Sequence, residues 1–517
     1  MVENFAGALG HIFNLYNFML MTLGVAVGIV VGALPGLTAT MALAVLVPFT
    51  FIMDPATGLM TLGGIYVGAI YGGCISAILI NTPGTPSAIA TTFDGYPLAQ
   101  KGKGEHALVA AAFSSGVGGV IGALVLIFLA PLLVEVALKF GPPEYFWLAI
   151  FGLTIISTLA AKSILKGLIG GALGLLVSTV GLAPIGGEMR YTFGFYQLQG
   201  GIELIVALIG FFCIPEILNM IADKKIGSGQ VGKLQSRTGV AGSVMMALIK
   251  QPVLLIRSAI IGAFVGIVPG AGGNVAGLVS YNEAVRWSKD SEKFGTGMLE
   301  GVAASEAANN SEVGGSLVPL LTLGIPGAPP AAVIMGALLL HGLRPGPDLF
   351  IQHGAITYTF LLSLVVANVV MFVLGFFGAK HIARMINLPA NYLAPLIAFM
   401  TVIGSYAIRN NMLDVVIMVT MGLAGYILRR LDFHPGPIVL GMILGPIAEK
   451  GLVQSLMLAR SQESIAVVFF TRPISLVLII LCIISAAWPV VAGFRKKHSE
   501  RLREQTVDGT REVTADG

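Results

Sequence analysis

Long apolar runs dominate the pattern of hydrophobic and polar positions along this chain. The runs at 204–214, 360–377 and 474–487 are examples, and only Ser363 and Asn368 place polar side chains in the second of them. A helix needs about 20 apolar residues to cross the hydrocarbon core of a bilayer. Runs of this kind give roughly 11 to 15 candidate spans. The pattern therefore predicts an all-α polytopic membrane protein.

Proline-glycine pairs interrupt the apolar runs at four places. They are Pro35-Gly36, Pro83-Gly84, Pro269-Gly270 and Pro326-Gly327. Proline removes a backbone donor and glycine tolerates unusual dihedral angles, so such a pair favours a break in a helix. Irregular backbone at membrane depth persists only where it is buried in protein or lines a wet cavity. We therefore expect broken helices or re-entrant hairpins here; for any single pair, a simple packing kink is the alternative.

An internal repeat is the second feature of the pattern. Four motifs recur in the same order and at nearly constant spacing: 31–36 with 265–270, 81–86 with 324–329, 142–145 with 389–392, and 210–215 with 441–446. Internal repeats are common in secondary transporters. Four ordered matches favour a duplication over coincidence.

Loop charge predicts how the two copies are oriented, because short cytoplasmic loops collect Lys and Arg. If the basic segment 223–250 is cytoplasmic, counting spans places the 162–166 loop inside and its counterpart at Arg409 outside. The Arg190 loop falls outside, whereas its counterpart at 429–430 falls inside. The copies are thus expected to run in opposite directions, as an inverted-topology repeat.

These patterns divide the chain into five predicted segments. They are a first membrane repeat at 9–221, a basic cytoplasmic linker at 222–250, a second membrane repeat at 251–470, an extra C-terminal transmembrane helix at 471–494, and a charged cytoplasmic tail at 495–517.

Composition agrees with a lipid bilayer as the solvent. Only 11% of the residues are charged, whereas a soluble domain carries roughly 25%. The 67 glycines allow transmembrane backbones to approach closely. A formal net charge of +4 is too small to indicate a nucleic-acid partner.

The sequence offers no apparatus for catalysis. It contains no phosphate-binding G-x-x-x-x-G-K-[ST] loop, no H-E-x-x-H motif and no nucleophile elbow. Its three cysteines lie in apolar runs without a metal-site spacing. We therefore expect a protein that is not an enzyme and that has no cofactor beyond a coupling cation.

The breaks are the first candidate site. A helix that starts after a break points free N–H groups at its surroundings and favours an anion there, while freed carbonyls at other half-helix ends suit Na⁺. The candidate residues of the first half are Pro35, Gly36, Thr38, Thr40, Asn81, Thr82, Pro83, Gly84, Thr85 and Ser87. Those of the second half are Pro269, Gly270, Gly272, Gly273, Asn274, Gly324, Pro326 and Gly327.

A polar segment before the fourth break is the second candidate. In a helix, Glu306, Asn309 and Asn310 share one face. Charged groups within a spanning segment are costly and usually functional. The alternative, which the sequence favours for Glu300 and leaves open for Glu306, is a cytoplasmic loop before the span. Asp94 reads as a loop residue.

Several of these segments resemble one known family. The motifs at 32–38, 306–310, 320–327 and 341–347 are similar to those of the large membrane subunit of the tripartite tricarboxylate transporters, the TctA family. The resemblance extends over about 9–494. It implies a multi-pass permease of the bacterial inner membrane with two partners, a small four-helix membrane subunit (TctB-like) and a periplasmic solute-binding protein (TctC-like).

The resemblance also implies an activity. The family imports carboxylates, with citrate and other tricarboxylates as its named substrates, by symport with a cation gradient, generally that of Na⁺. The alternatives are a channel-like or scaffold membrane protein without coupled transport and an intramembrane enzyme. An inverted duplication with paired breaks favours the transporter, because alternating access needs two symmetry-related states.

Overall fold

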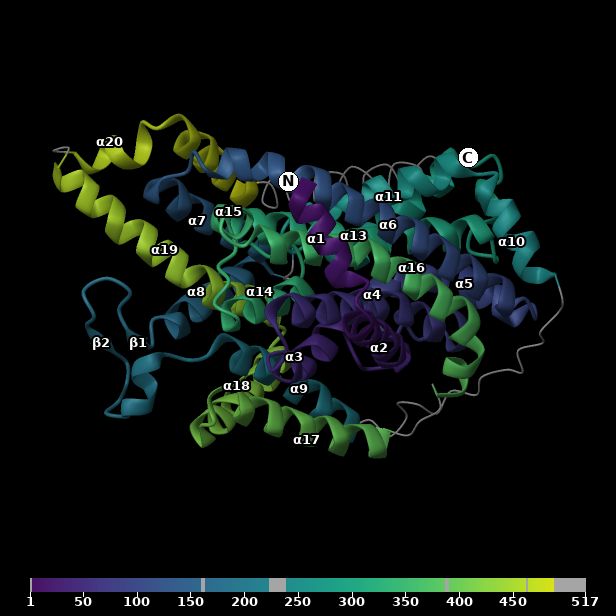
Figure 1. Ribbon diagram of the computed structural model, residues 1–517, viewed down its shortest axis with the longest axis horizontal. Coiled ribbons are helices and arrows are strands. Elements are labelled where there is room, and N and C mark those ends of the chain that lie inside the picture. The colour runs from purple at the N-terminus through teal and green to yellow at the C-terminus, as the bar shows by residue number, and fades with distance from the viewer. Residues whose placement is uncertain (1, 160–162, 223–238, 386–389, 462–463, 488–517) are drawn as a thin grey trace, which may run out of the picture. The chain divides into compact units, whose positions relative to one another are not determined.

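The computed structural model describes residues 2–159, 163–222, 239–385, 390–461 and 464–487 (Figure 1). This part of the chain is almost entirely helical, which confirms the predicted all-α class. A single two-stranded antiparallel pairing among these residues joins β1 (Gly181–Leu182) and β2 (Met189–Arg190).

The helices up to residue 222 follow the apolar runs and the breaks between them. In chain order they are α1 (Val2–Ile12), α2 (Leu15–Ala33), α3 (Ala39–Thr50), α4 (Pro55–Ile80), η1 (Pro86–Ala88), α5 (Ile89–Gln100), α6 (Gly104–Ala137), α7 (Pro142–Leu159), α8 (Ile164–Ser178), η2 (Tyr196–Gly200) and α9 (Leu204–Ala222).

The remaining helices follow in the second part of the chain. They are α10 (Val240–Ile249), α11 (Pro252–Ile267), α12 (Gly272–Trp287), η3 (Ser291–Lys293), α13 (Leu299–Leu323), α14 (Pro329–Leu340), α15 (Pro347–Ile351), α16 (Gly354–Met385), α17 (Ala390–Arg409), α18 (Met412–Arg430), α19 (Pro435–Ser461) and α20 (Ile465–Phe470). A further short apolar helix spans Pro473–Ala487.

Eight of the described helices are long and apolar enough to cross a membrane, or nine if the bent pair α10 and α11 forms one span. The chain is therefore polytopic. The number is below the roughly 11 to 15 spans expected from apolar length. The breaks leave helices such as α3 and α14 too short to cross a bilayer by themselves. Helix α13 is long enough and nearly all of it is buried, but its polar residues make it less apolar than the eight counted helices.

The predicted linker and C-terminal segments are only partly described. The end of the 222–250 linker is helical, since α10 occupies Val240–Ile249 and meets α11 at a bend of 76°. The 223–238 part of the linker and the 495–517 tail lie outside the described residues. Of the predicted 471–494 span, the structure describes the helix Pro473–Ala487.

Two compact units emerge from the contacts, and neither coincides with a predicted repeat. The first unit contains α1–α6 and α9–α18, and the second contains α7, α8, α19, α20 and the small strand pair. The division arises because α7 and α8 pack on α19, from the other half of the sequence, within the second unit.

Small residues bring the helices of the first unit close together. Gly24, Gly28 and Gly32 on α2 face α4. Gly64, Gly68 and Gly72 on α4 return the contact, so that a Cβ atom on any of these six would meet the backbone of the other helix. The four-residue spacing places each set on one helix face, which is the small-residue packing of transmembrane helices.

Helix α13 lies at the centre of the packing of the first unit. It packs against both α6 and α11 (Figure 1). Gly118 and Gly122 of α6 approach the α13 backbone on one side, and Gly262 and Gly266 of α11 approach it on the other. These contacts leave α13 with nearly every residue from Gly301 to Thr322 buried.

The same kinds of contact occur around two helices that carry matching motifs. In the first unit α9 packs against α17 and α18, and its Glu216 pairs with Arg429 at 2.5 Å. In the second unit α19 packs against α7 and α8, and its Glu449 pairs with Arg190 at 2.6 Å. Each helix thus takes its partners from the opposite half of the sequence.

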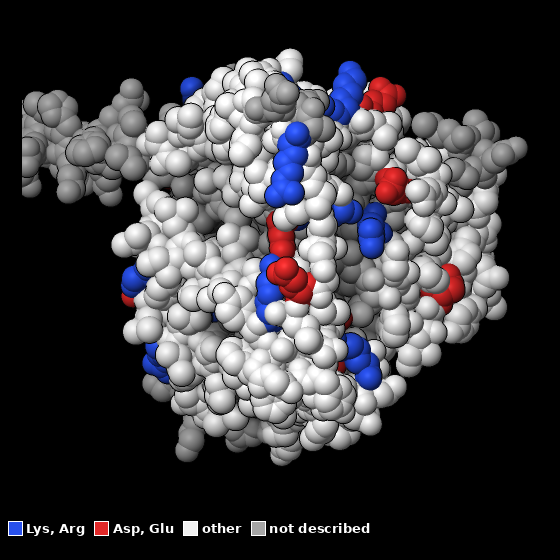
Figure 2. Space-filling model, turned by 90° about the vertical axis from the view of Figure 1, so that its left-hand side faces the viewer, with Lys and Arg blue, Asp and Glu red and all other residues white. Residues whose placement is uncertain are grey.

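Among the described residues, few charged side chains lie on the face drawn in Figure 2. Most of the face in Figure 2 carries neither acidic nor basic residues. Large apolar side chains point outward instead, including Phe128, Phe264, Phe377 and Phe399. Outward apolar side chains of this kind fit a lipid environment, where they need not be covered by protein.

Candidate functional site

Each of the four proline-glycine pairs lies between two helices, as expected. The first two breaks follow the ends of α2 and α4 and precede α3 and η1, which continues into α5. The last two breaks follow α11 and α13 and precede α12 and α14. All four breaks therefore create new helix starts, where N–H groups lack partners within the helix.

Within each half, the two breaks pack against each other in the same way. The Gly84 N–H donates to the Gly73 carbonyl at 3.2 Å, and a Cβ on Gly84 would meet the Gly32 carbonyl oxygen. The Gly327 N–H donates to the Ser316 carbonyl at 3.1 Å, and a Cβ on Gly327 would meet the Gly266 carbonyl oxygen. Glycine is required at both positions because no side-chain atom fits.

Between the halves, the helix starts form two pairs. α12 contacts η1, and α3 contacts α14, so each pair joins a first break from one half with a second break from the other. In the former pair, a Cβ on Gly273 would lie 2.8 Å from the Ser87 Cβ. The structure therefore brings Gly272 and Gly273 together with Thr85 and Ser87.

The polar residues of α13 lie in a helix buried inside the first unit. Glu306, Asn309 and Asn310 are fully buried, so Glu306 does not belong to a loop. Its carboxylate accepts hydrogen bonds from the hydroxyls of Thr91 and, at 2.9 Å, Ser115. Glu300, in the first turn, instead accepts a bond from the Gln251 amide at 2.9 Å in a partly buried setting.

Glu312 is the residue that sequence reasoning missed. It is fully buried one turn beyond Asn309, and neither of its carboxylate oxygens has a hydrogen-bond partner among the described residues. The side-chain oxygens of Asn309 and Asn310 are also without a donor in this part of the structure. The signal was available, since Glu312 follows Asn309 at the i+3 spacing of a shared helix face.

Other predicted site residues lie at the helix ends without joining this cluster. The Thr38 hydroxyl caps α3 by accepting from the Met41 N–H at 3.2 Å. Asn81 closes α4 in the left-handed conformation, with φ of 56°. Asn81, Thr82 and Asn274 are exposed. Thr40 is buried at the start of α3.

The structure corrects the interpretation of Asp94 as a loop residue. Asp94 is fully buried within α5. One carboxylate oxygen accepts the N–H groups of Gly295, Gly297 and Met298 at 2.7–2.9 Å, and the other accepts the Tyr281 hydroxyl at 2.9 Å. Asp94 therefore fixes the loop before α13, because a carboxylate can satisfy several orphan backbone donors.

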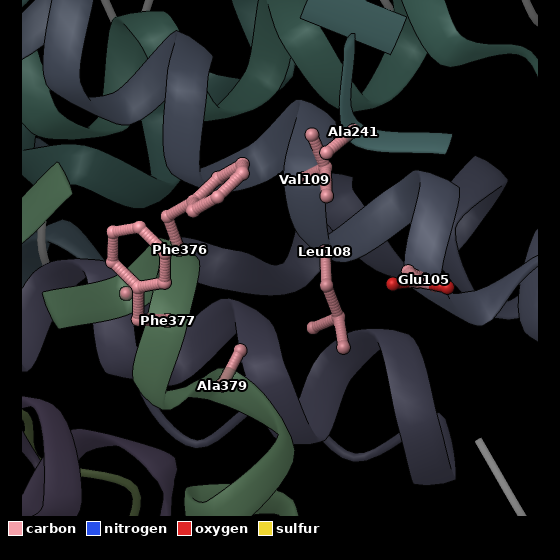
Figure 3. A pocket seen from close by; sticks show the side chains of 8 residues that line it. Glu105, Leu108, Val109, Ala241, Phe376, Phe377 and Ala379 are labelled. Carbon is pink, nitrogen blue, oxygen red and sulfur yellow. The ribbon is translucent and has the colours of Figure 1, made fainter. Parts of the chain in front are cut away.

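A pocket of about 220 Å³ lies elsewhere in the first unit (Figure 3). Its lining residues are Glu105, Leu108 and Val109 of α6, Ala241 of α10, and Gly375, Phe376, Phe377 and Ala379 of α16. Apolar side chains dominate the view in Figure 3, and Glu105 is the one carboxylate drawn. None of the predicted site residues lines it, so we place the candidate site at α13 and the breaks.

Comparison with known proteins identifies the family. Residues 18–440 match the tripartite tricarboxylate transporter TctA family. The chain belongs to this family. It is 38% identical over 484 residues, covering 93% of this chain and 95% of the relative, to the "Uncharacterized 52.8 kDa protein in TAR-I ttuC' 3'region" of Agrobacterium vitis.

A second relative gives a consistent result. It is the "Uncharacterized protein in TAR-II ttuC' 3'region" of Agrobacterium vitis, 36% identical over 237 residues that cover 45% of this chain and 97% of the relative. No solved structure matches the chain. As a TctA-family member with eight or nine candidate spans, the protein is a multi-pass membrane subunit of the tripartite tricarboxylate transporter type, as its motifs predicted.

Proposed function

We propose that this TctA-family protein imports tricarboxylates or related carboxylates by symport with a cation, generally Na⁺. In this proposal a periplasmic solute-binding protein delivers the substrate, a small four-helix membrane subunit completes the complex, and the whole system lies in the bacterial inner membrane. The observation that carries the proposal is the pairing of helix starts from opposite halves, η1 with α12 and α3 with α14.

These helix starts suit a carboxylate for an electrostatic reason. The N-terminus of a helix carries a partial positive charge and unpaired N–H groups, so it attracts an anion without a basic side chain. Two such ends in contact, as at η1 and α12, favour a carboxylate group nearby. The hydroxyls of Thr85 and Ser87, which are hydrogen-bonded to each other at 2.9 Å, add polar groups at the same place.

The uptake experiment uses the full complex in proteoliposomes with labelled citrate and its loaded binding protein. An inward Na⁺ gradient should accelerate uptake by at least about tenfold over an equal K⁺ gradient, a modest coupling free energy. Uptake that is equal under all cation gradients would contradict symport. Uptake without the binding protein would contradict the tripartite route.

Alternating access through an inverted repeat is part of the same proposal. It is supported by the matched contacts of Gly84 and Gly327 and by the exchange of helix partners around α9 and α19. Two structurally similar halves that enter from opposite sides can exchange conformations and so expose one site to either side in turn.

Cysteine accessibility tests the inversion at two matched positions of the first unit. Lys103 and Gln352 are exposed and lie just before the long helices α6 and α16. A membrane-impermeant thiol reagent added to intact cells should label the Gln352→Cys variant from the periplasmic side. The Lys103→Cys variant should be labelled only after the membrane is permeabilised. Labelling of both from the same side would contradict the inverted topology.

A further inference from the structure

We propose that Glu312, Asn309 and Ser87 form the binding site of the coupling cation, and that this cation is Na⁺. The site lies between α13, the start of α12 and η1. This inference rests on the proposed symport and assigns its ion to particular side chains. The candidate residues taken from the sequence did not include Glu312.

The three side chains converge on Gly273, the second residue of α12. A Cβ atom on Gly273 would lie 2.6 Å from Asn309 Oδ1 and 3.5 Å from Glu312 Oε2. It would also lie 2.8 Å from the Cβ of Ser87, whose hydroxyl pairs with that of Thr85 at 2.9 Å. The absence of a side chain at Gly273 thus leaves two side-chain oxygens of α13 and the side chain of Ser87 around one small space.

Glu312 has no compensating side chain at this position among the described residues. Its side chain is fully buried, and no described residue donates a hydrogen bond to either carboxylate oxygen. An ionised carboxylate without partners is very costly to bury. No ion pair given by the structure's described residues involves Glu312. A bound cation would supply the missing charge.

The neighbouring atoms favour Na⁺ over a proton as that charge. A proton needs only the carboxylate, whereas here the whole side-chain amide of Asn309, its oxygen and its nitrogen, is also buried without a hydrogen-bond partner among the described residues, which leaves its oxygen available as a ligand. Hard cations are bound by several carboxylate, amide and hydroxyl oxygens together. Among the described residues no group of three or more His, Cys, Asp or Glu side chains could hold a metal ion, so the proposed site relies on a single carboxylate together with amide and hydroxyl oxygens.

Glu306 and Glu300 differ from Glu312 on the same helix. Glu306 already accepts hydrogen bonds from Thr91 and Ser115, and Glu300 accepts one from Gln251. Glu300→Gln is therefore a matched control, because it makes the same chemical change on the same helix at a carboxylate that has a donor.

The first test measures ion binding without transport. Purified protein in detergent is heated in NaCl or in KCl at equal ionic strength. A ligand that binds only the folded state raises the unfolding temperature in a concentration-dependent way. Wild type and Glu300→Gln should be stabilised by Na⁺ more than by K⁺. Glu312→Gln should lose this difference, and Ser87→Ala should shift the half-maximal Na⁺ concentration upward by about tenfold.

The second test measures Na⁺-driven uptake of labelled citrate by the full complex. If wild type responds to Na⁺ and Glu312→Gln keeps the same half-maximal Na⁺ concentration in both tests, this assignment is wrong while symport stands. If wild-type uptake ignores every cation gradient, the proposed symport fails as well. Stabilisation of wild type by acid but not by Na⁺ would assign a proton to Glu312 and overturn the Na⁺ site.

Discussion

Replacing Gly273 with alanine should reduce substrate uptake by about 100-fold or more while leaving the protein folded. The added methyl group would enter the space between α12, η1 and α13, at 2.6 Å from Asn309 Oδ1 and 2.8 Å from the Ser87 Cβ. These atoms would have to move by several tenths of an ångström. Displacements approaching ~1 Å in a positioned site can cost about 100-fold in activity. Initial rates of labelled citrate uptake by the reconstituted complex measure the effect.

Gly277 supplies the control for this experiment. It lies one helical turn further along α12, and the nearest atoms to its added Cβ would be the Ser87 carbonyl oxygen at 3.5 Å and the Ala90 Cβ at 3.6 Å. These are ordinary van der Waals distances, so Gly277→Ala should keep nearly wild-type uptake. Equal uptake by the two variants, at matched protein levels, would show that transport does not depend on the space at Gly273.

A leucine at Gly68 should prevent stable folding. Gly68 faces α2, where an added Cβ would meet the Val25 carbonyl and lie 3.0 Å from the Ile29 backbone nitrogen. Backbone atoms cannot move aside as a flexible side chain can, so the two helices must separate. Overpacking a core costs about 1–3 kcal/mol, and separation of α2 from α4 also loses the contacts of the neighbouring glycines. We expect little protein in the membrane and a thermal midpoint lowered by many degrees.

Gly10→Leu is the comparison for this substitution. Gly10 lies in α1, is exposed, and has no atom within 4 Å of an added Cβ. Leucine also favours a helix over glycine by about 0.5–1 kcal/mol. Gly10→Leu should therefore retain or slightly raise the thermal midpoint of the detergent-purified protein. A Gly68→Leu variant as stable as Gly10→Leu would show that α2 and α4 do not need their close approach.

Local chemistry explains why much of the fold was predictable. Apolar runs select helices in a bilayer because every backbone group must be satisfied within the segment. Pro269-Gly270 and Pro326-Gly327 follow the ends of α11 and α13. A proline-glycine pair stops the hydrogen-bond pattern of a helix whatever tertiary contacts surround it. Those effects act within a few residues, so the helices and their breaks could be predicted directly from the sequence.

The candidate site was only partly predictable from the sequence, because some of its contacts join residues that are far apart in the chain. The spacing of Glu306, Asn309 and Asn310 indicated a polar helix face, and the structure places all three inside the first unit. It did not show that Thr91 and Ser115 satisfy Glu306, because these donors lie on α5 and α6, nearly 200 residues or more away in the chain. The role of Asp94 was missed on similar grounds, since its backbone donors belong to the loop before α13.

The sequence by itself determined the bilayer as solvent, the helical class, the positions of the four breaks and the family resemblance, because each depends on local composition or on short motifs. Only the tertiary structure decided which helix starts meet, that α7 and α8 pack on α19, and that Glu312 has no donor while Glu306 has two. These outcomes depend on contacts between distant segments. A buried carboxylate becomes either a structural group or an ion ligand according to the neighbours that the fold brings to it.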